Sequence, residues 1–215
     1  MAGEKRTKKE LILIYTTFMK FFDASGIDFV LFYGSLLGII RDNEFIDGDD
    51  DIDVLVFRKD YQKLIDFIEK EDTENLIKKT EDEKDILQLY YGDIGPFDIY
   101  ITDSSDRKLT INWEKDVYHI NDIIPLKTIE IYGYHIQIPN YPEKILRKYY
   151  GFNWYIPIDR KQPVIYRHLY GYFMYYVYRN KVNRLTIISL ILFTLLISLF
   201  IYISLKGKSK KKFIL

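Results

Sequence analysis

The sequence contains no cysteine, which excludes disulfide bridges, thiolate metal ligands and a cysteine nucleophile. It also has no excess of charge, because 31 Lys and Arg residues balance 31 Asp and Glu residues and the formal net charge is +0. A nucleic-acid partner recognised through overall charge would need a basic protein, so none is expected. Any function must therefore be sought in local groups of residues.

The charge is distributed unevenly along the chain. Residues 42–53 are mostly acidic, whereas the last ten residues, KGKSKKKFIL, carry five lysines and no acid. Before this basic tail, residues 185–205 (LTIISLILFTLLISLFIYISL) contain no charged residue, no Pro and no Gly. As a helix this run would be about 31 Å long, the thickness of the hydrocarbon core of a bilayer. We therefore predict one C-terminal transmembrane helix over residues 185–205.

The segments around this helix complete the predicted organisation. Residues 1–157 would form the catalytic domain and residues 206–215 the basic tail, and the Tyr-rich, basic residues 158–184 would lie along the membrane interface or pack on the domain. The N-terminus reads as an amphipathic helix rather than a signal peptide, because Thr16, Thr17 and Lys20 interrupt its apolar run. We expect a single-pass protein with a C-terminal anchor, membrane lipid as a partner and the domain in the cytosol. Basic residues on both sides of the span leave its orientation open.

The hydrophobic pattern predicts alternating helices and strands in the domain. Helices are expected at residues 8–24, 36–41 and 59–70, strands at 28–33, 52–57, 76–79, 86–91 and 97–102, and a hairpin at 128–138 that turns at Gly133. The order has no strict βαβ repeat. We therefore predict an α/β fold, with a mixed sheet flanked by helices.

A group of aspartates enters the predicted strand at 52–57. Asp49, Asp51 and Asp53 share one parity and would point to the same side, while Ile52 and Val54 would point into the core. Two carboxylates about 4 Å apart repel by roughly 4 kcal/mol at an effective dielectric constant near 20. A bound cation would offset this repulsion, although a solvated acidic loop is the alternative. An EF-hand is excluded, because its sixth position would be Ile52 rather than Gly.

A turn upstream of these aspartates has the residues of a phosphate-binding corner. Gly34 would let a ligand approach the backbone, and Ser35 could cap the following helix and donate from its hydroxyl. Phosphate and magnesium sites occur together, so the turn and the acidic strand support each other. Asp98, between apolar neighbours, is the candidate for a third carboxylate, and a salt-bridged structural aspartate is the alternative.

These motifs resemble a known family. The run YGSLLGIIRDNEFIDGDDDIDVLV is similar to the signature of the LicD family, which includes fukutin and fukutin-related protein. The later segments PFDIYI, DIIPLKTIEIYGYHIQIPNYPEKIL and KYYG agree with it, so the resemblance covers roughly residues 12–157. Gly48 departs from the family pattern, which usually has Trp there, and this puts the choice of substrate in doubt.

The resemblance implies a nucleotidyltransferase-like fold and a phosphotransferase that uses Mg2+ or Mn2+. Such enzymes move phosphocholine or ribitol phosphate from a CDP-alcohol donor to a sugar hydroxyl, here on a glycan or glycolipid acceptor. The implied donor-phosphate ligands are Gly34, Ser35 and Arg41. The implied catalytic and metal-binding residues are acidic: Asp51 and Asp53 hold the metal with help from Asp49, and Asp98 is the third ligand or the base.

Two other functions remain open from the sequence. A glycosyltransferase could use the same D-x-D pattern with a nucleotide sugar, but it would not require the Gly-Ser turn before the acidic strand. A catalytically inactive membrane scaffold would have no reason to keep the mutually repelling aspartates at positions 51, 53 and 98.

Overall fold

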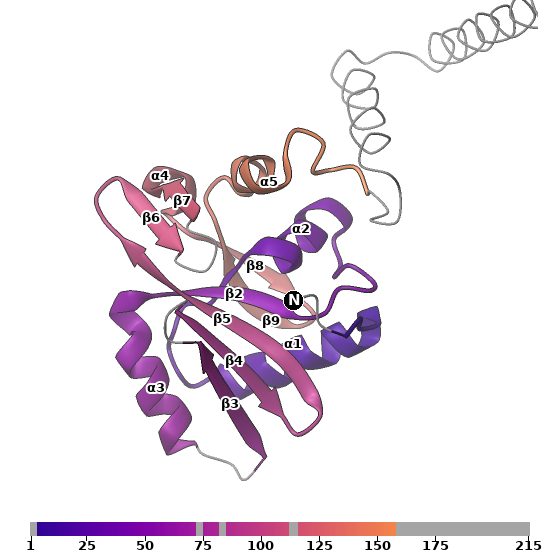
Figure 1. The fold of residues 1–215 in the computed structure, drawn as a ribbon, viewed down its shortest axis with the longest axis vertical. Helices are drawn as coiled ribbons and strands as arrows, with labels where there is room; N and C mark the ends of the chain where they lie inside the picture. The colour runs from indigo at the N-terminus through magenta and orange to yellow at the C-terminus, as the bar shows by residue number, and fades with distance from the viewer. Residues whose placement is uncertain (1–3, 72–74, 82–84, 112–115, 158–215) are drawn as a thin grey trace, which may run out of the picture. The chain divides into compact units, whose positions relative to one another are not determined.

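The structure, a computed structural model, describes residues 4–71, 75–81, 85–111 and 116–157 (Figure 1). Met1–Tyr155 forms one compact unit. The segments predicted at 158–184, 185–205 and 206–215 lie outside the described residues, so these three assignments and the domain boundary at 157 remain predictions. Within the described part of the chain, no helix has both the length and the apolar character needed to cross a membrane.

The described chain folds into helices and strands in mixed order. The helices are α1 (Lys8–Phe22), α2 (Tyr33–Asp42), the short 3-10 turn η1 (Arg58–Asp60), α3 (Tyr61–Lys70), α4 (Ile120–Ile123) and α5 (Pro142–Tyr150). The strands are β1 (Val30–Leu31), β2 (Ile52–Phe57), β3 (Leu76–Glu81), β4 (Ile86–Tyr91), β5 (Ile94–Ser104), β6 (Lys108–Ile111), β7 (Asp116–His119), β8 (Lys127–Ile131) and β9 (Tyr134–Ile138).

The strands form one mixed sheet in the order β3-β4-β5-β2-β1-β9-β8, and β6 and β7 continue from β5. The pairs β2–β5 and β1–β9 are parallel, while the other described pairs are antiparallel. This arrangement confirms the predicted α/β fold with a mixed sheet flanked by helices. It also puts β2, the strand that follows the acidic loop, near the centre of the sheet.

The two faces of the sheet have different roles. On one face α1 packs against β5, where the rings of Phe18 and Phe97 stack with centroids 4.9 Å apart. Ile52 pairs with Phe97 across the strands, so the even-numbered β2 residues share this apolar face, as predicted. The opposite face carries Asp53 and Asp98, and α2 packs on it beside α5 (Figure 1).

The structure corrects the predicted start of α2. The helix begins at Tyr33, so Gly34 and Ser35 lie in its first turn, and the N-cap is Phe32, which makes no side-chain capping bond. The predicted cap by Ser35 is therefore wrong. Tyr33 has a φ of 40°, in the left-handed region, and this sharp turn lets the chain pass from β1 into the helix without a loop. Only Val30 and Leu31 of the predicted 28–33 strand pair as strand β1.

Candidate active site

Two buried aspartates lie side by side at the centre of the sheet. Asp53 on β2 pairs directly with Asp98 on the parallel strand β5, and the two residues are 5% and 7% exposed. Adjacent strands are about 4.8 Å apart, so the two carboxyl groups start from neighbouring positions on the same face. The structure thus brings together two residues that are 45 positions apart in the sequence and that the sequence analysis had assigned to one site.

Several groups fix the orientation of Asp53. The Gly34 backbone N–H donates to Asp53 Oδ2 at 3.0 Å, and the Tyr100 hydroxyl donates to Asp53 Oδ1 at 3.1 Å. The backbone N–H of Asp53 in turn donates to Ser35 Oγ at 2.9 Å. Ser35 therefore connects the first turn of α2 to β2 instead of capping the helix. Each carboxylate oxygen of Asp53 has one donor, which leaves lone pairs for a further partner.

Gly34 is required by the carboxylates around it. A Cβ atom at this position would lie 2.4 Å from Asp49 Oδ2 and 3.4 Å from Asp53 Oδ2. The first distance is far below van der Waals contact, so any larger residue would displace the Asp49 carboxylate. The glycine was predicted to admit a ligand to the backbone; the structure shows that it admits Asp49 to the start of α2.

The acidic loop gathers three more carboxylates. Asp49, Asp50 and Asp51 can place one oxygen each within 4.8 Å of the others, and all three are partly buried. Strand parity predicted that Asp49 and Asp51 point to the same side as Asp53, and Asp50 was not among the predicted site residues. Parity does not apply to these residues, because β2 begins only at Ile52. The run of adjacent aspartates was itself the signal that could have identified Asp50.

The site has an excess of negative charge, and this charge affects the pKa of Asp53. Burial raises the pKa of this carboxyl well above its ordinary value, and the nearby charges of Asp51, Asp98 and Asp49 raise it further. The hydrogen bond from Tyr100 opposes these effects on the Asp53 pKa. Burial, followed by the charge of Asp53, likewise raises the pKa of the Tyr100 hydroxyl, so this hydroxyl stays protonated as a donor. A cation would relieve the repulsion.

Asp98 is oriented by groups that sequence reasoning missed. Gln88 Nε2 donates to Asp98 Oδ1 at 2.9 Å and to Oδ2 at 3.2 Å, and the Tyr90 hydroxyl donates to Gln88 Oε1 at 2.8 Å. Gln88 pairs with Asp98 across the antiparallel strands β4 and β5, so both side chains lie on the site face. Only the register of the sheet could have identified these groups, since neither Gln88 nor Tyr90 is distinctive in sequence.

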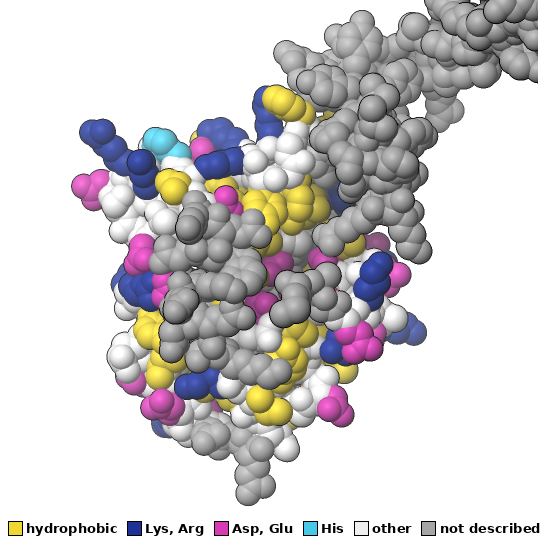
Figure 2. All heavy atoms as spheres, viewed as in Figure 1, with side chains coloured by type: hydrophobic (Ala, Val, Ile, Leu, Met, Phe, Trp, Pro, Cys, Tyr) yellow, Lys and Arg dark blue, Asp and Glu magenta, His cyan; other side chains and the backbone are white. Residues whose placement is uncertain are grey.

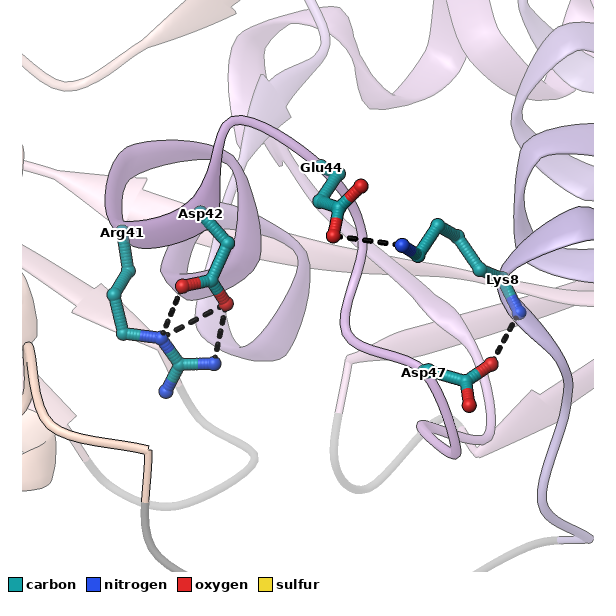
Figure 3. Close-up of polar contacts among 5 residues, drawn as sticks. All are labelled: Lys8, Arg41, Asp42, Glu44 and Asp47. Carbon is teal, nitrogen blue, oxygen red and sulfur yellow. Dashed lines mark hydrogen bonds and ion pairs between the residues drawn. The ribbon is translucent and has the colours of Figure 1, made fainter.

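Arg41 has a different environment from the one predicted. It lies in the last turn of α2, and its Nε donates to Asp42 Oδ1 at 3.0 Å and to Oδ2 at 2.9 Å, while Nη2 contacts Oδ2 at 2.6 Å (Figure 3). The guanidinium would have to exchange this neighbour for a phosphate. Its role as a phosphate ligand therefore stays a prediction.

The N-terminal segment holds the acidic loop in place. The Arg6 N–H donates to the Asp49 carbonyl at 2.8 Å, and the Gly48 N–H donates to the Arg6 carbonyl at 2.9 Å. Lys8 adds a backbone bond to Asp47 Oδ1 at 2.9 Å and an ion pair to Glu44 at 2.6 Å (Figure 3). On the surface, acidic side chains are visible in the middle of this face, next to hydrophobic ones (Figure 2).

Comparison with known proteins shows the family of this chain. Residues 26–141 match the family model described as LicD/FKTN/FKRP, nucleotidyltransferase domain. The chain belongs to the LicD family. It is similar to the lipopolysaccharide cholinephosphotransferase LicD of Haemophilus influenzae, with 36% identity over 112 residues, which is 49% of this chain and 42% of the relative. The chain thus matches less than half the length of that relative.

Two solved structures are similar at a low level. The lincosamide adenylyltransferase LnuA with lincomycin bound has 19% identity and a TM-score of 0.43, over 63% of this chain and 82% of that one. ANT(2″)-Ia with adenylyl-2″-tobramycin has 15% identity and a TM-score of 0.43, over 76% and 86% of the two chains. Similarity at this level supports no argument about function.

Proposed function

We propose that this protein is a phosphotransferase that moves a phospho-alcohol group, of the phosphocholine or ribitol-phosphate type, from a CDP-alcohol to a sugar hydroxyl of a glycan or glycolipid. The observation that carries the proposal is the pair of buried carboxylates Asp53 and Asp98, which lie beside the first turn of α2 in a chain of the LicD family. The cholinephosphotransferase activity in the name of the Haemophilus relative supports the same reaction class.

The residues of the site fit a divalent cation such as Mg2+ or Mn2+. The donor set consists of carboxylate oxygens, the ligands that these hard cations prefer. Burial raises the pKa of Asp53, the charges of Asp51, Asp98 and Asp49 raise it further, and a cation would offset that negative charge. We assign the ligands to Asp51 and Asp53 with help from Asp49, and Asp50 lies in the same cluster as Asp49 and Asp51. A cation bound there would neutralise charge on the oxygens of the donor phosphates.

The protein's own side chains would align the substrates and accept the proton of the acceptor hydroxyl. Phosphoryl transfer depends on alignment and charge stabilisation more than on a covalent nucleophile. Asp98 would accept the proton of the acceptor hydroxyl or serve as a further ligand, and the two bonds from Gln88 keep its carboxylate in one orientation. The Gly34 N–H is already used by Asp53, so it would act on the donor through that carboxylate.

We also propose that the chain is anchored by its C-terminus and acts next to a membrane. The charge-free run at residues 185–205 and the basic, Tyr-rich residues 158–184 support this, and the catalytic domain would then be cytosolic. A glycolipid acceptor would suit such a position.

In the decisive experiment, the full-length chain is incubated with Mg2+, glycan or glycolipid acceptors, and each member of a panel of CDP-alcohols and nucleotide sugars. We expect CMP release from one CDP-alcohol, absent in Asp53→Asn and retained in Asp93→Asn, whose aspartate is exposed in the turn between β4 and β5. Release of a nucleotide from a nucleotide sugar alone would establish the glycosyltransferase alternative. No turnover of any donor would favour the scaffold.

A further inference from the structure

We propose that Arg6 binds a phosphate of the donor through its guanidinium, and that the N-terminal segment is therefore part of the substrate site. This inference rests on the proposed function and extends it to a residue that lies before the segment 26–141 matched by the family model. The ligand class is a diphosphate, such as the one that links the two halves of a CDP-alcohol.

The backbone of Arg6 is fixed against the acidic loop. Its N–H donates to the carbonyl of Asp49, and its own carbonyl accepts from the N–H of Gly48, as in a two-residue strand pair. Asp49 in turn lies against Gly34 at the start of α2, beside Asp53. The side chain of Arg6 thus starts next to the carboxylates that we assign to the cation. Its position does not depend on any contact made by the guanidinium.

The guanidinium itself is incompletely satisfied. Arg6 Nε is buried and has no hydrogen-bond partner among the described residues, and Arg6 Nη1 is 4.0 Å from Glu10 Oε1, at the limit of an ion pair. Buried donors are nearly always bonded in folded proteins, so an unbonded one at a candidate site calls for an acceptor. The Arg6 side chain is 23% exposed, so part of it faces solvent. A phosphate offers paired oxygens that match the planar fork of arginine.

The charge of Arg6 acts on the same face as Asp98. Burial, followed by the negative charge of Asp98, raises the pKa of the Tyr90 hydroxyl, and the Arg6 guanidinium opposes this increase. Tyr90 donates to Gln88, which donates to Asp98. The Arg6 guanidinium is therefore close enough to influence Tyr90, which is linked through Gln88 to Asp98. A diphosphate between Arg6 and a cation held by the aspartates would contact positive charge on both sides.

The competing interpretation is that Arg6 only holds the acidic loop in place. The two interpretations can be separated, because the bonds to Gly48 and Asp49 are made by the Arg6 backbone and survive replacement of its side chain. Arg6→Gln removes the charge, and Arg6→Lys keeps the charge but loses the fork. Arg107→Gln is the matched control, since Arg107 is exposed between β5 and β6.

The test measures binding of inorganic pyrophosphate and of CDP-choline to the full-length chain by calorimetry at a fixed Mg2+ concentration, with melting temperatures recorded for each variant. We expect Arg6→Gln to weaken pyrophosphate binding about tenfold or more, the effect of losing a charge-assisted hydrogen bond. Arg6→Lys should lie between Arg6→Gln and the wild type, Arg107→Gln should match the wild type, and all melting temperatures should be similar.

The outcomes separate this inference from the proposed function. Equal pyrophosphate affinity in the wild type and both Arg6 variants, or no binding by the wild type, would overturn the role of Arg6. Weakened pyrophosphate binding in Arg6→Gln, without turnover of any CDP-alcohol by the wild type, would keep the phosphate site and reject the proposed donor. A lower melting temperature in Arg6→Gln with unchanged pyrophosphate affinity would show that the side chain serves only the loop.

Discussion

Replacing Asp53 by Asn should stabilise the metal-free protein while abolishing its activity. The buried Asp53 carboxylate stands beside Asp98 on the neighbouring strand, with Asp51 and Asp49 close by. At a separation of about 5 Å and an effective dielectric constant near 20, one such pair repels by about 3 kcal/mol. The amide keeps the shape of the side chain: its oxygen can accept from the Gly34 N–H, and its NH2 can donate to the Tyr100 hydroxyl, which also accepts.

Exchanging two charge-assisted hydrogen bonds for neutral ones costs about 1 kcal/mol each. A net gain of about 1 kcal/mol then remains, which corresponds to an increase of about 2–4 °C in the melting temperature of a domain of this size. The folded-state pKa of Asp53 is raised above its ordinary value of 3.8, so ionising this carboxyl costs more free energy in the folded state than in the unfolded state. The stability of the metal-free wild type should therefore decrease as pH rises from about 4 through the raised pKa. The Asn variant should lack this part of the decrease.

The assay is thermal unfolding in EDTA over this pH range, repeated with excess Mg2+. We expect the advantage of Asp53→Asn to grow with pH in EDTA and to shrink or reverse when Mg2+ stabilises the wild type. Asp93→Asn, at an exposed position, controls for the loss of one negative charge. If Asp53→Asn were less stable than the wild type in EDTA at neutral pH, or if its advantage did not vary with pH, the assignment of repulsion at this site would be refuted.

Three further changes test other parts of the structure. Gly34→Ala places a methyl group 2.4 Å from the present position of Asp49 Oδ2, so it should reduce CMP release at least tenfold and weaken Mg2+ binding. The domain should stay folded by circular dichroism, and near-normal turnover would contradict this prediction. Tyr100→Phe removes one donor to the Asp53 carboxylate and should raise the Asp53 pKa further. The acidic limb of the pH–rate profile would then move to higher pH, and an unmoved limb would argue against the hydrogen bond from Tyr100 to Asp53. Deleting residues 185–215 should leave a fragment that still binds anionic liposomes in a salt-sensitive way, and a fragment that ignores liposomes at low salt would refute an interfacial role for residues 158–184.

The local pattern of the sequence predicted most of the elements that surround the site. The helical spacing of residues 59–70 and the strand at 52–57 correspond to α3 and β2, and the hairpin at Gly133 corresponds to β8 and β9. These elements have regular apolar periodicity, which reports the buried face directly. The strands β6 and β7 were not predicted, since each has only four residues, too few to show a period.

The site residues that are close together in the sequence could be predicted, whereas most of those brought together by strand pairing could not. Asp49, Asp51 and Asp53 stand out as a run, and Asp98 was the only one of the distant residues to be named. Gln88 and Tyr100 reach the carboxylates through strand register, which depends on pairings between segments far apart in sequence. Ser35 was predicted as a cap from local preference. The sharp turn at Tyr33 instead starts the helix two residues before Ser35, and the Ser35 hydroxyl accepts a hydrogen bond from the backbone N–H of Asp53.

The central claim, that the acidic cluster holds a divalent cation, is tested most directly by titrating Mn2+ into the purified protein and following free Mn2+ by electron paramagnetic resonance. The wild type should bind Mn2+ in competition with Mg2+, Asp51→Asn and Asp53→Asn should lose this binding, and Asp93→Asn should retain it. Unchanged Mn2+ binding in both Asp51→Asn and Asp53→Asn would contradict the claim.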